Sequence, residues 1–151
     1  MKIVESFEIP AEVERVFELV ASPAGMLLFE GYGMIPGIAK VTSSAPERAV
    51  GVEDVITNSD GSTHQEHVVE LEPPRLYAVE IGPFESPMRH LVTHLNERWE
   101  LEGSPSGGTV VRREFRFHPR GPLRGLIVRW LLLPQMRAAM ARNHRALAAA
   151  L

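Results

Sequence analysis

The C-terminal stretch, residues 121–151, constrains the fold more than any other part of the sequence. It is apolar and helical in its spacing, whereas almost everything upstream alternates like β-strand. Pro134 removes one backbone hydrogen bond and crowds the preceding turn, so we expect two helical pieces, about 122–133 and 134–150. A helix this long and apolar is stable only against a large apolar surface, which the rest of the chain must supply.

Composition indicates one folded domain over residues 1–151, because that length suits a single core. Hydrophobic residues make up 44% and charged residues 23%, the balance of a globular protein rather than a disordered one. The net charge of −3 disfavours nucleic acid as a partner. The chain has no cysteine, which excludes disulfides, thiolate catalysis and cysteine-ligated zinc.

The expected location is the cytoplasm. The opening sequence, MKIVESFEIP, carries acids where a signal peptide needs an apolar core. The longest apolar run, 126–133, is interrupted by Arg129 and is too short to span a bilayer, so we expect no stable membrane insertion. The sequence leaves the oligomeric state open between monomer and homodimer.

The order of the patterns predicts an α+β fold. Residues 3–9 alternate as a strand, and two short helices follow, the second at 26–29. From residue 39 to residue 117 the chain reads as about six strands joined by hairpins. Such runs of antiparallel strands beside segregated helices are typical of the α+β class.

Asp60-Gly61 lies between two strand-like runs and predicts a hairpin with a two-residue turn. The register that follows sets Asp54 opposite His67 on the face that we expect to point into the core. A carboxylate that orients an imidazole can act as a general acid or base, in an enolisation, an aldol-type cyclisation or a dehydration. A satisfied polar pair within the sheet, or a different register, is the alternative interpretation.

The inner faces of two later strands also carry charge. Alternation over 91–101 and 111–117 places Glu97 and Arg113 among apolar side chains, opposite each other or one diagonal step apart. Inside a cavity, Arg113 could bind a ligand carboxylate, phenolate or carbonyl. The alternative is an internal salt bridge that neutralises buried charge and that Glu5 could join.

Within the terminal helix, Asn143 falls in the middle of an apolar arc that includes Met136 and Met140. Methionines adapt to irregular ligands and an amide can anchor one polar atom, but both methionines could equally be core. Trp99 and Tyr77 are inward aromatic residues that either fill core or stack on a ligand. The six histidines offer no three convergent ligands, so we expect no metal.

Four stretches of the sequence carry a resemblance to one superfamily. They are 9–17 (IPAEVERVF), 71–77 (LEPPRLY), 107–111 (GGTVV) and 117–121 (FHPRG). In this order they resemble the helix-grip fold of the START-domain and birch-pollen-allergen-like (SRPBCC) superfamily, in its polyketide cyclase/dehydrase and lipid-transport branch. The resemblance implies a curved antiparallel sheet of about seven strands wrapped round a long C-terminal helix. It also implies two short helices after the first strand and a cavity between sheet and helix.

We therefore expect the cavity to bind a hydrophobic small molecule (a polyketide, lipid, quinone or aromatic metabolite) without a cofactor. The residues expected to bind this ligand are Asp54, His67, Tyr77, Glu97, Trp99, Arg113, Met136, Met140 and Asn143. One alternative is a cofactor-independent cyclase or dehydratase, in which Asp54 and His67 act as acid and base and Arg113 stabilises an oxyanion. A second alternative is a module that contacts a protein or a membrane through the apolar helix at 126–133. The fold alone does not choose between them.

Overall fold

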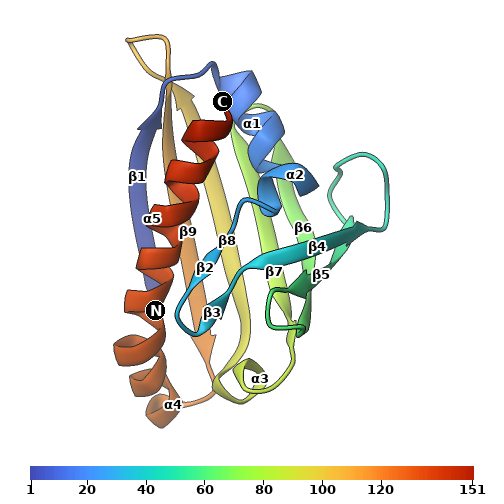
Figure 1. Ribbon diagram of the computed structural model, residues 1–151, viewed down its shortest axis with the longest axis vertical. Helices are drawn as coiled ribbons and strands as arrows, with labels where there is room; N and C mark the ends of the chain where they lie inside the picture. The colour runs from blue at the N-terminus through green and yellow to red at the C-terminus, as the bar shows by residue number, and fades with distance from the viewer.

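A computed structural model describes residues 1–151. A seven-stranded antiparallel sheet in the order β1-β9-β8-β7-β6-β5-β4 lies behind a long C-terminal helix, which runs along its face (Figure 1). The strands of this sheet are β1 (Lys2–Ile9), β4 (Ile38–Ser43), β5 (Glu53–Asn58), β6 (Thr63–Glu72), β7 (Leu76–Phe84), β8 (Val92–Gly103) and β9 (Thr109–Pro119). A separate two-stranded sheet consists of β2 (Gly31–Tyr32) and β3 (Ile35–Pro36).

The helices are α1 (Val13–Val20), α2 (Pro23–Met26), α3 (Met88–Leu91), α4 (Pro122–Ile127), the π-helical turn η1 (Val128–Leu132) and α5 (Leu133–Ala150). The two short helices after the first strand and the terminal helical segment are present as predicted, although the second short helix ends at Met26 instead of spanning 26–29, and α3 was not predicted. Two short helices follow the first strand, and α5 packs against the sheet, so the predicted α+β helix-grip fold is confirmed.

The terminal segment is divided at the proline, as predicted, but the division is a widened turn. Pro134 is the second residue of α5, and the π-helical turn η1 directly precedes that helix. A proline ring crowds the carbonyl four residues earlier, and the looser turn lies over that position. Val128 and Leu132 point from this turn into the core.

The hydrophobic core fills the space between the sheet and the helices. One cluster of 26 buried residues joins both layers. Helix α1 contributes Val16, Phe17 and Val20, which share one helix face because of their spacing. The side chain of Ser22 caps the start of α2 by accepting a hydrogen bond of 3.1 Å from the backbone N–H of Gly25.

The loop between β5 and β6 corrects the predicted register. The N–H of Asn58 donates to the carbonyl of Ser62 at 2.8 Å, so the loop has three residues, Ser59-Asp60-Gly61, rather than two. Gly61 adopts a positive φ of 85°, which suits the last position of a three-residue hairpin loop.

This change of one residue turns β6 over, because side chains alternate with a period of two. Asp54 is paired with Glu66, and His67 is paired with Glu53. The predicted Asp54–His67 pair is therefore wrong, and Glu66 rather than His67 points inward.

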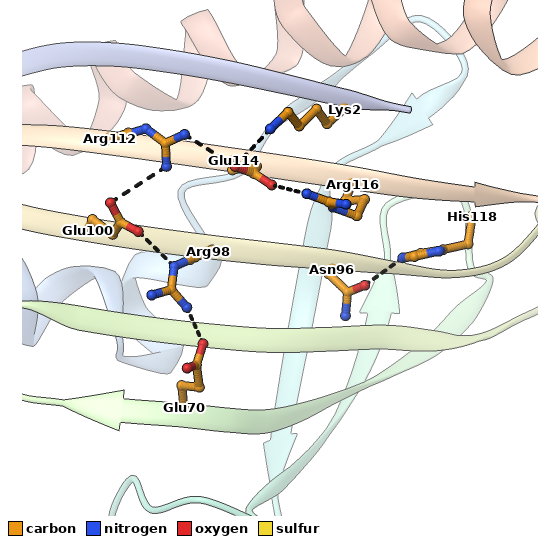
Figure 2. Close-up of polar contacts among 9 residues, drawn as sticks. All are labelled: Lys2, Glu70, Asn96, Arg98, Glu100, Arg112, Glu114, Arg116 and His118. Atoms are coloured by element: carbon orange, nitrogen blue, oxygen red, sulfur yellow. Dashed lines mark hydrogen bonds and ion pairs between the residues drawn. The ribbon is translucent and has the colours of Figure 1, made fainter.

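The outer face of the sheet carries a band of ion pairs across β6, β8, β9 and β1. Figure 2 draws its side chains and two neighbours: Lys2, Glu70, Asn96, Arg98, Glu100, Arg112, Glu114, Arg116 and His118. At its centre the carboxylate of Glu114 lies 3.3 Å from a guanidinium nitrogen of Arg112. Exposed ion pairs of this kind each contribute about 0–1 kcal/mol to the free energy of unfolding. The band therefore gives the sheet a hydrophilic outer face and adds little to its stability.

The register of the β5–β6 hairpin gives a stability prediction. Gly61→Ala should destabilise the protein by about 1 kcal/mol, because alanine is strained at positive φ. Gly103→Ala is the matched control, because both glycines have open space around the missing Cβ but Gly103 lacks positive φ. Urea unfolding of the two variants checks the difference, and equal stabilities would contradict the positive φ at Gly61.

Candidate functional site

A cavity of about 160 Å³ lies between the sheet and α5. Most of its wall is apolar, with side chains from the sheet such as Leu95 and Phe115 facing Leu132 and Met136 from the terminal helices. Residues of the β2–β3 turn, the β5–β6 loop and the segment from Phe84 to Met88 also line it. In Figure 1 these segments lie toward the lower half of the molecule, away from α1.

Arg113 is the buried cation of the cavity wall. Its Nε donates to a carboxylate oxygen of Glu97 at 2.7 Å, and its Nη2 lies 2.6 Å from the same oxygen in an ion pair. Its Nη1 donates to the side-chain oxygen of Asn143 at 2.9 Å, which joins β9 to α5. The guanidinium carbon also lies 4.0 Å from the ring centre of Trp99, a cation–π distance.

Register explains this arrangement. Arg113 pairs with Trp99 across the two strands, and Glu97 pairs with Phe115, so the acid and the guanidinium are diagonal neighbours, which is one of the two predicted arrangements. Burial raises the pKa of Glu97, and the charge of Arg113 opposes that rise. The guanidinium stays charged, because no protein environment deprotonates arginine.

Two buried hydrogen-bond donors on the cavity wall have no acceptor. They are the hydroxyl of Tyr77 and the side-chain nitrogen of Asn143. Burial raises the pKa of Tyr77, so its hydroxyl keeps its proton and remains a donor. Unpaired buried polar atoms are costly, and Asn143 is also the one polar residue in the apolar arc of α5.

A second polar group lines the cavity where β5 meets β6. The side-chain nitrogen of Asn58 lies 3.1 Å from Nδ1 of His64, and Nε2 of His64 lies 3.3 Å from a carboxylate oxygen of Glu66. Since the amide donates to Nδ1, the imidazole proton belongs on Nε2 and is donated to Glu66. Glu66 has no lysine or arginine partner, unlike Glu97.

Sequence reasoning missed this group because it assumed the two-residue turn. With three residues in the loop, His64 and Glu66 face inward. His64 pairs with Ile56 across the strands, and Glu66 pairs with Asp54. The signal that could have found them is glycine at the third loop position, which favours the longer hairpin loop.

Asp54 is fully buried but does not line the cavity. Its carboxylate accepts a hydrogen bond of 2.6 Å from Nη1 of Arg48, which the sequence analysis did not single out. Arg48 belongs to the connection between β4 and β5, so this salt bridge fastens that connection to the sheet. Its buried position indicates a structural role.

The predicted ligand-binding residues divide into two groups. Six of them line the cavity: Tyr77, Glu97, Trp99, Arg113, Met136 and Asn143. Met140 is core, and His67 lies 3.2 Å from Glu53 on the opposite face of β6 from Glu66. Glu5 is paired with Arg113 across the strands, but its carboxylate accepts instead from Arg137 at 3.4 Å.

His144 lies beside the site on α5 and stacks on the ring of Phe7, with ring centres 3.6 Å apart. Burial, with a smaller effect from the charge of Arg113, lowers the pKa of His144 to about 3. The imidazole is therefore neutral at physiological pH, which avoids a second cation near the guanidinium.

No three histidine, aspartate or glutamate side chains lie close enough together to hold a metal ion. None of the helices combines the length and the apolar character needed to cross a bilayer.

Comparison with known proteins identifies the class. The chain overlays a ginseng major latex-like protein from Panax ginseng with a TM-score of 0.75 at 10% identity, covering 99% of this chain and 95% of that one. It overlays a Thalictrum norcoclaurine synthase mutant in complex with a transition-state analogue with a TM-score of 0.69 at 17% identity, covering 100% and 96%. The protein XoxI of Bacillus cereus gives 0.69 at 20% identity, covering 99% and 94%.

These overlays show that the chain has the helix-grip fold, and at such low identities they show the fold alone. The chain belongs to the polyketide cyclase/dehydrase and lipid transport family, whose model matches residues 1–151. A comparison with curated protein sequences gives no match.

The buried ion pair gives a second prediction. Arg113→Met should lower the free energy of unfolding by about 3–5 kcal/mol, because it leaves the Glu97 carboxylate buried and unpaired. Adding Glu97→Gln should restore part of that loss. Arg112→Met, which removes exposed ion pairs on the other face of the same strand, should cost only about 0–1 kcal/mol. Equal losses in denaturant unfolding of the two arginine variants would contradict the prediction.

His144 gives a third prediction, about pH. Its folded-state pKa lies below the ordinary value, so the unfolded chain binds the extra proton between about pH 6.5 and pH 3. Stability from this residue is therefore present above that window and is lost as pH falls through it. His144→Phe keeps an aromatic ring against Phe7, so its stability relative to the parent protein should rise as pH falls. Parallel curves of unfolding free energy against pH would refute this.

Proposed function

We propose that the protein binds a neutral, single-ring hydrophobic molecule that carries a carbonyl or similar acceptor, such as a small quinone or aromatic ketone. One observation carries the proposal: the Tyr77 hydroxyl and the Asn143 amide nitrogen are buried donors without acceptors on the wall of an apolar cavity. A ligand oxygen placed between the walls would satisfy donors that the protein itself leaves unpaired.

Cavity size supports a small ligand. The volume is about 160 Å³, close to the ~150 Å³ engineered cavity that accepts benzene. Pockets for drug-sized ligands usually measure about 300–1,000 Å³. Within the proposed ligand classes, one aromatic ring with short substituents fits this space, whereas a multi-ring polyketide or a lipid chain requires the cavity to expand.

The charges of the wall favour a neutral ligand. Arg113 is already neutralised by Glu97, and Glu66 adds a carboxylate whose only ionic neighbour is His64. A ligand carboxylate would therefore meet like charge without a free cation. A ligand carbonyl meets no such repulsion, and a hydroxyl elsewhere on the ring could donate to Glu66.

Binding can be measured by calorimetry with three matched compounds: 4-hydroxyacetophenone, ethylbenzene and benzoate. We expect the ketone to bind most tightly and benzoate least. Asn143→Asp keeps the oxygen that accepts from Arg113 and removes only the amide donor. It should weaken the affinity for the ketone about tenfold, the value of one hydrogen bond, and leave the affinity for ethylbenzene almost unchanged. Asn96→Asp, the same change on the outer face, is the control. The proposal fails if none of the compounds binds, or if Asn143→Asp weakens the affinities for the ketone and for ethylbenzene equally.

A second candidate function, acid–base catalysis on the bound ring, is favoured by Glu66. It is an inward carboxylate with no arginine partner, and His64 holds one of its oxygens. Such a group can remove a proton next to a carbonyl without a cofactor. This proposal replaces the predicted Asp54–His67 pair, which the register does not form.

Glu66→Gln separates the two functions. It should leave the affinity for the ketone ligand within about threefold, since the amide keeps the shape of the carboxylate. Deuterium exchange at the ketone α-carbon, followed by mass spectrometry, should be faster with the parent protein than in buffer and should fall to the buffer rate with the variant. Exchange at the buffer rate with the parent protein would leave binding as the function and reject catalysis.

A further inference from the structure

A ridge of exposed apolar side chains follows α4 and η1. We define this α4–η1 ridge by its members: Leu123, Leu126, Ile127, Trp130 and Leu131. Leu123 is 75% exposed and Trp130 is 73% exposed, so the ridge does not belong to the core. Other residues of the same helices, Val128 and Leu132, are buried and already anchor the segment to the protein. The ridge is thus a rigid surface rather than a loose end.

Four exposed arginines lie on the ridge helices or beside them: Arg124 and Arg129 within α4 and η1, Arg120 just before α4, and Arg89 on the neighbouring α3. None of them forms an ion pair with a carboxylate, although most other arginines of the chain do. Arg120 donates to the backbone of Arg89 at 2.7 Å, and Arg124 donates to the backbone of Arg120 at 3.3 Å. After Glu114 the sequence contains no acidic residue. This end is therefore basic, although the whole chain has a net charge of −3.

The ridge lies next to the cavity. The backbone N–H of Arg120 donates to the carbonyl of Leu91 at 2.9 Å, which ties the start of α4 to α3. Met88 and Leu91 of α3 line the cavity, and so does Leu132 at the end of η1. In Figure 1, α3 and α4 occupy the same end of the molecule, opposite α1 and the C-terminus.

The charge pattern discriminates between possible occupants. In a two-fold dimer built on the ridge, the same patch would face itself and set arginines against arginines without acids between them. A bilayer that contains anionic lipid offers both complements, an apolar interior for the leucines and tryptophan and negative headgroups for the arginines. We propose that the α4–η1 ridge docks the protein peripherally on an anionic membrane surface.

Docking in this way would turn the cavity end of the molecule toward the bilayer. A hydrophobic molecule dissolved in the membrane could then reach the cavity over a short path. The docking proposal does not depend on the ligand proposal, because the ridge and its charges are complete without a ligand.

Co-sedimentation of the full-length protein with vesicles tests the proposal. We expect binding to vesicles of phosphatidylcholine with one third phosphatidylglycerol, little binding to phosphatidylcholine alone, and loss of binding as salt is added. The double variant Arg124→Gln/Arg129→Gln should bind about thirty-fold more weakly. The control is Arg15→Gln/Arg145→Gln, which removes two arginines that also lack an aspartate or glutamate partner but lie on α1 and late in α5; Arg15 donates to an oxygen of Leu151.

The apolar part is tested by Trp130→Ser against Val69→Ser, an exposed apolar residue on β6. Only the first should weaken vesicle binding, and circular dichroism should show both variants folded. Equal binding to neutral and anionic vesicles, or no binding to either, overturns the proposal. So does a dimer in sedimentation equilibrium that Trp130→Ser dissociates, because the ridge would then belong to a second copy.

Discussion

The buried contact of Arg113 with Glu97 and Asn143 is the interaction on which the rest of the structure depends. It connects β8, β9 and α5 through buried hydrogen bonds of 2.7 and 2.9 Å and an ion pair of 2.6 Å. Apolar packing alone would allow the helix to slide or rotate over the sheet, whereas a bond from Arg113 to one residue of α5 fixes its position. Asn143 uses its oxygen for this contact, and its nitrogen is left without an acceptor. The same residue thus holds the fold and carries an unpaired donor.

The sequence predicted those parts of the site that depend on local alternation. Alternation along β8 and β9 predicts that Glu97 and Arg113 point inward, either opposite each other or one diagonal step apart, and helical spacing predicts Asn143 within the apolar arc. Both predictions need only the repeat of side-chain directions within one element. The β5–β6 hairpin was different. There one loop residue decides which face of β6 is buried, so the wrong turn length exchanged Glu66 for His67.

Two further features could not be read from spacing. The partner of Asp54 is Arg48, which comes from an irregular connection whose path no periodic pattern describes. The volume of the cavity depends on how whole side chains such as Trp99 and Met136 pack against each other across the two layers. Pattern analysis assigns residues to faces, but packing between faces decides whether a gap remains and how large a ligand it takes.

The central claim is that the cavity holds a ligand oxygen against donors that the protein leaves unpaired. The most direct measurement is the NMR signal of the Asn143 side-chain amide, assigned by its loss in Asn143→Asp, during titration with 4-hydroxyacetophenone. The account predicts that the chemical shifts of both amide protons change and reach saturation as a hydrogen bond forms. The chemical shifts of the Asn96 amide, on the outer face, should stay unchanged. A titration in which the Asn143 signal does not move, or moves no more than that of Asn96, would contradict the account.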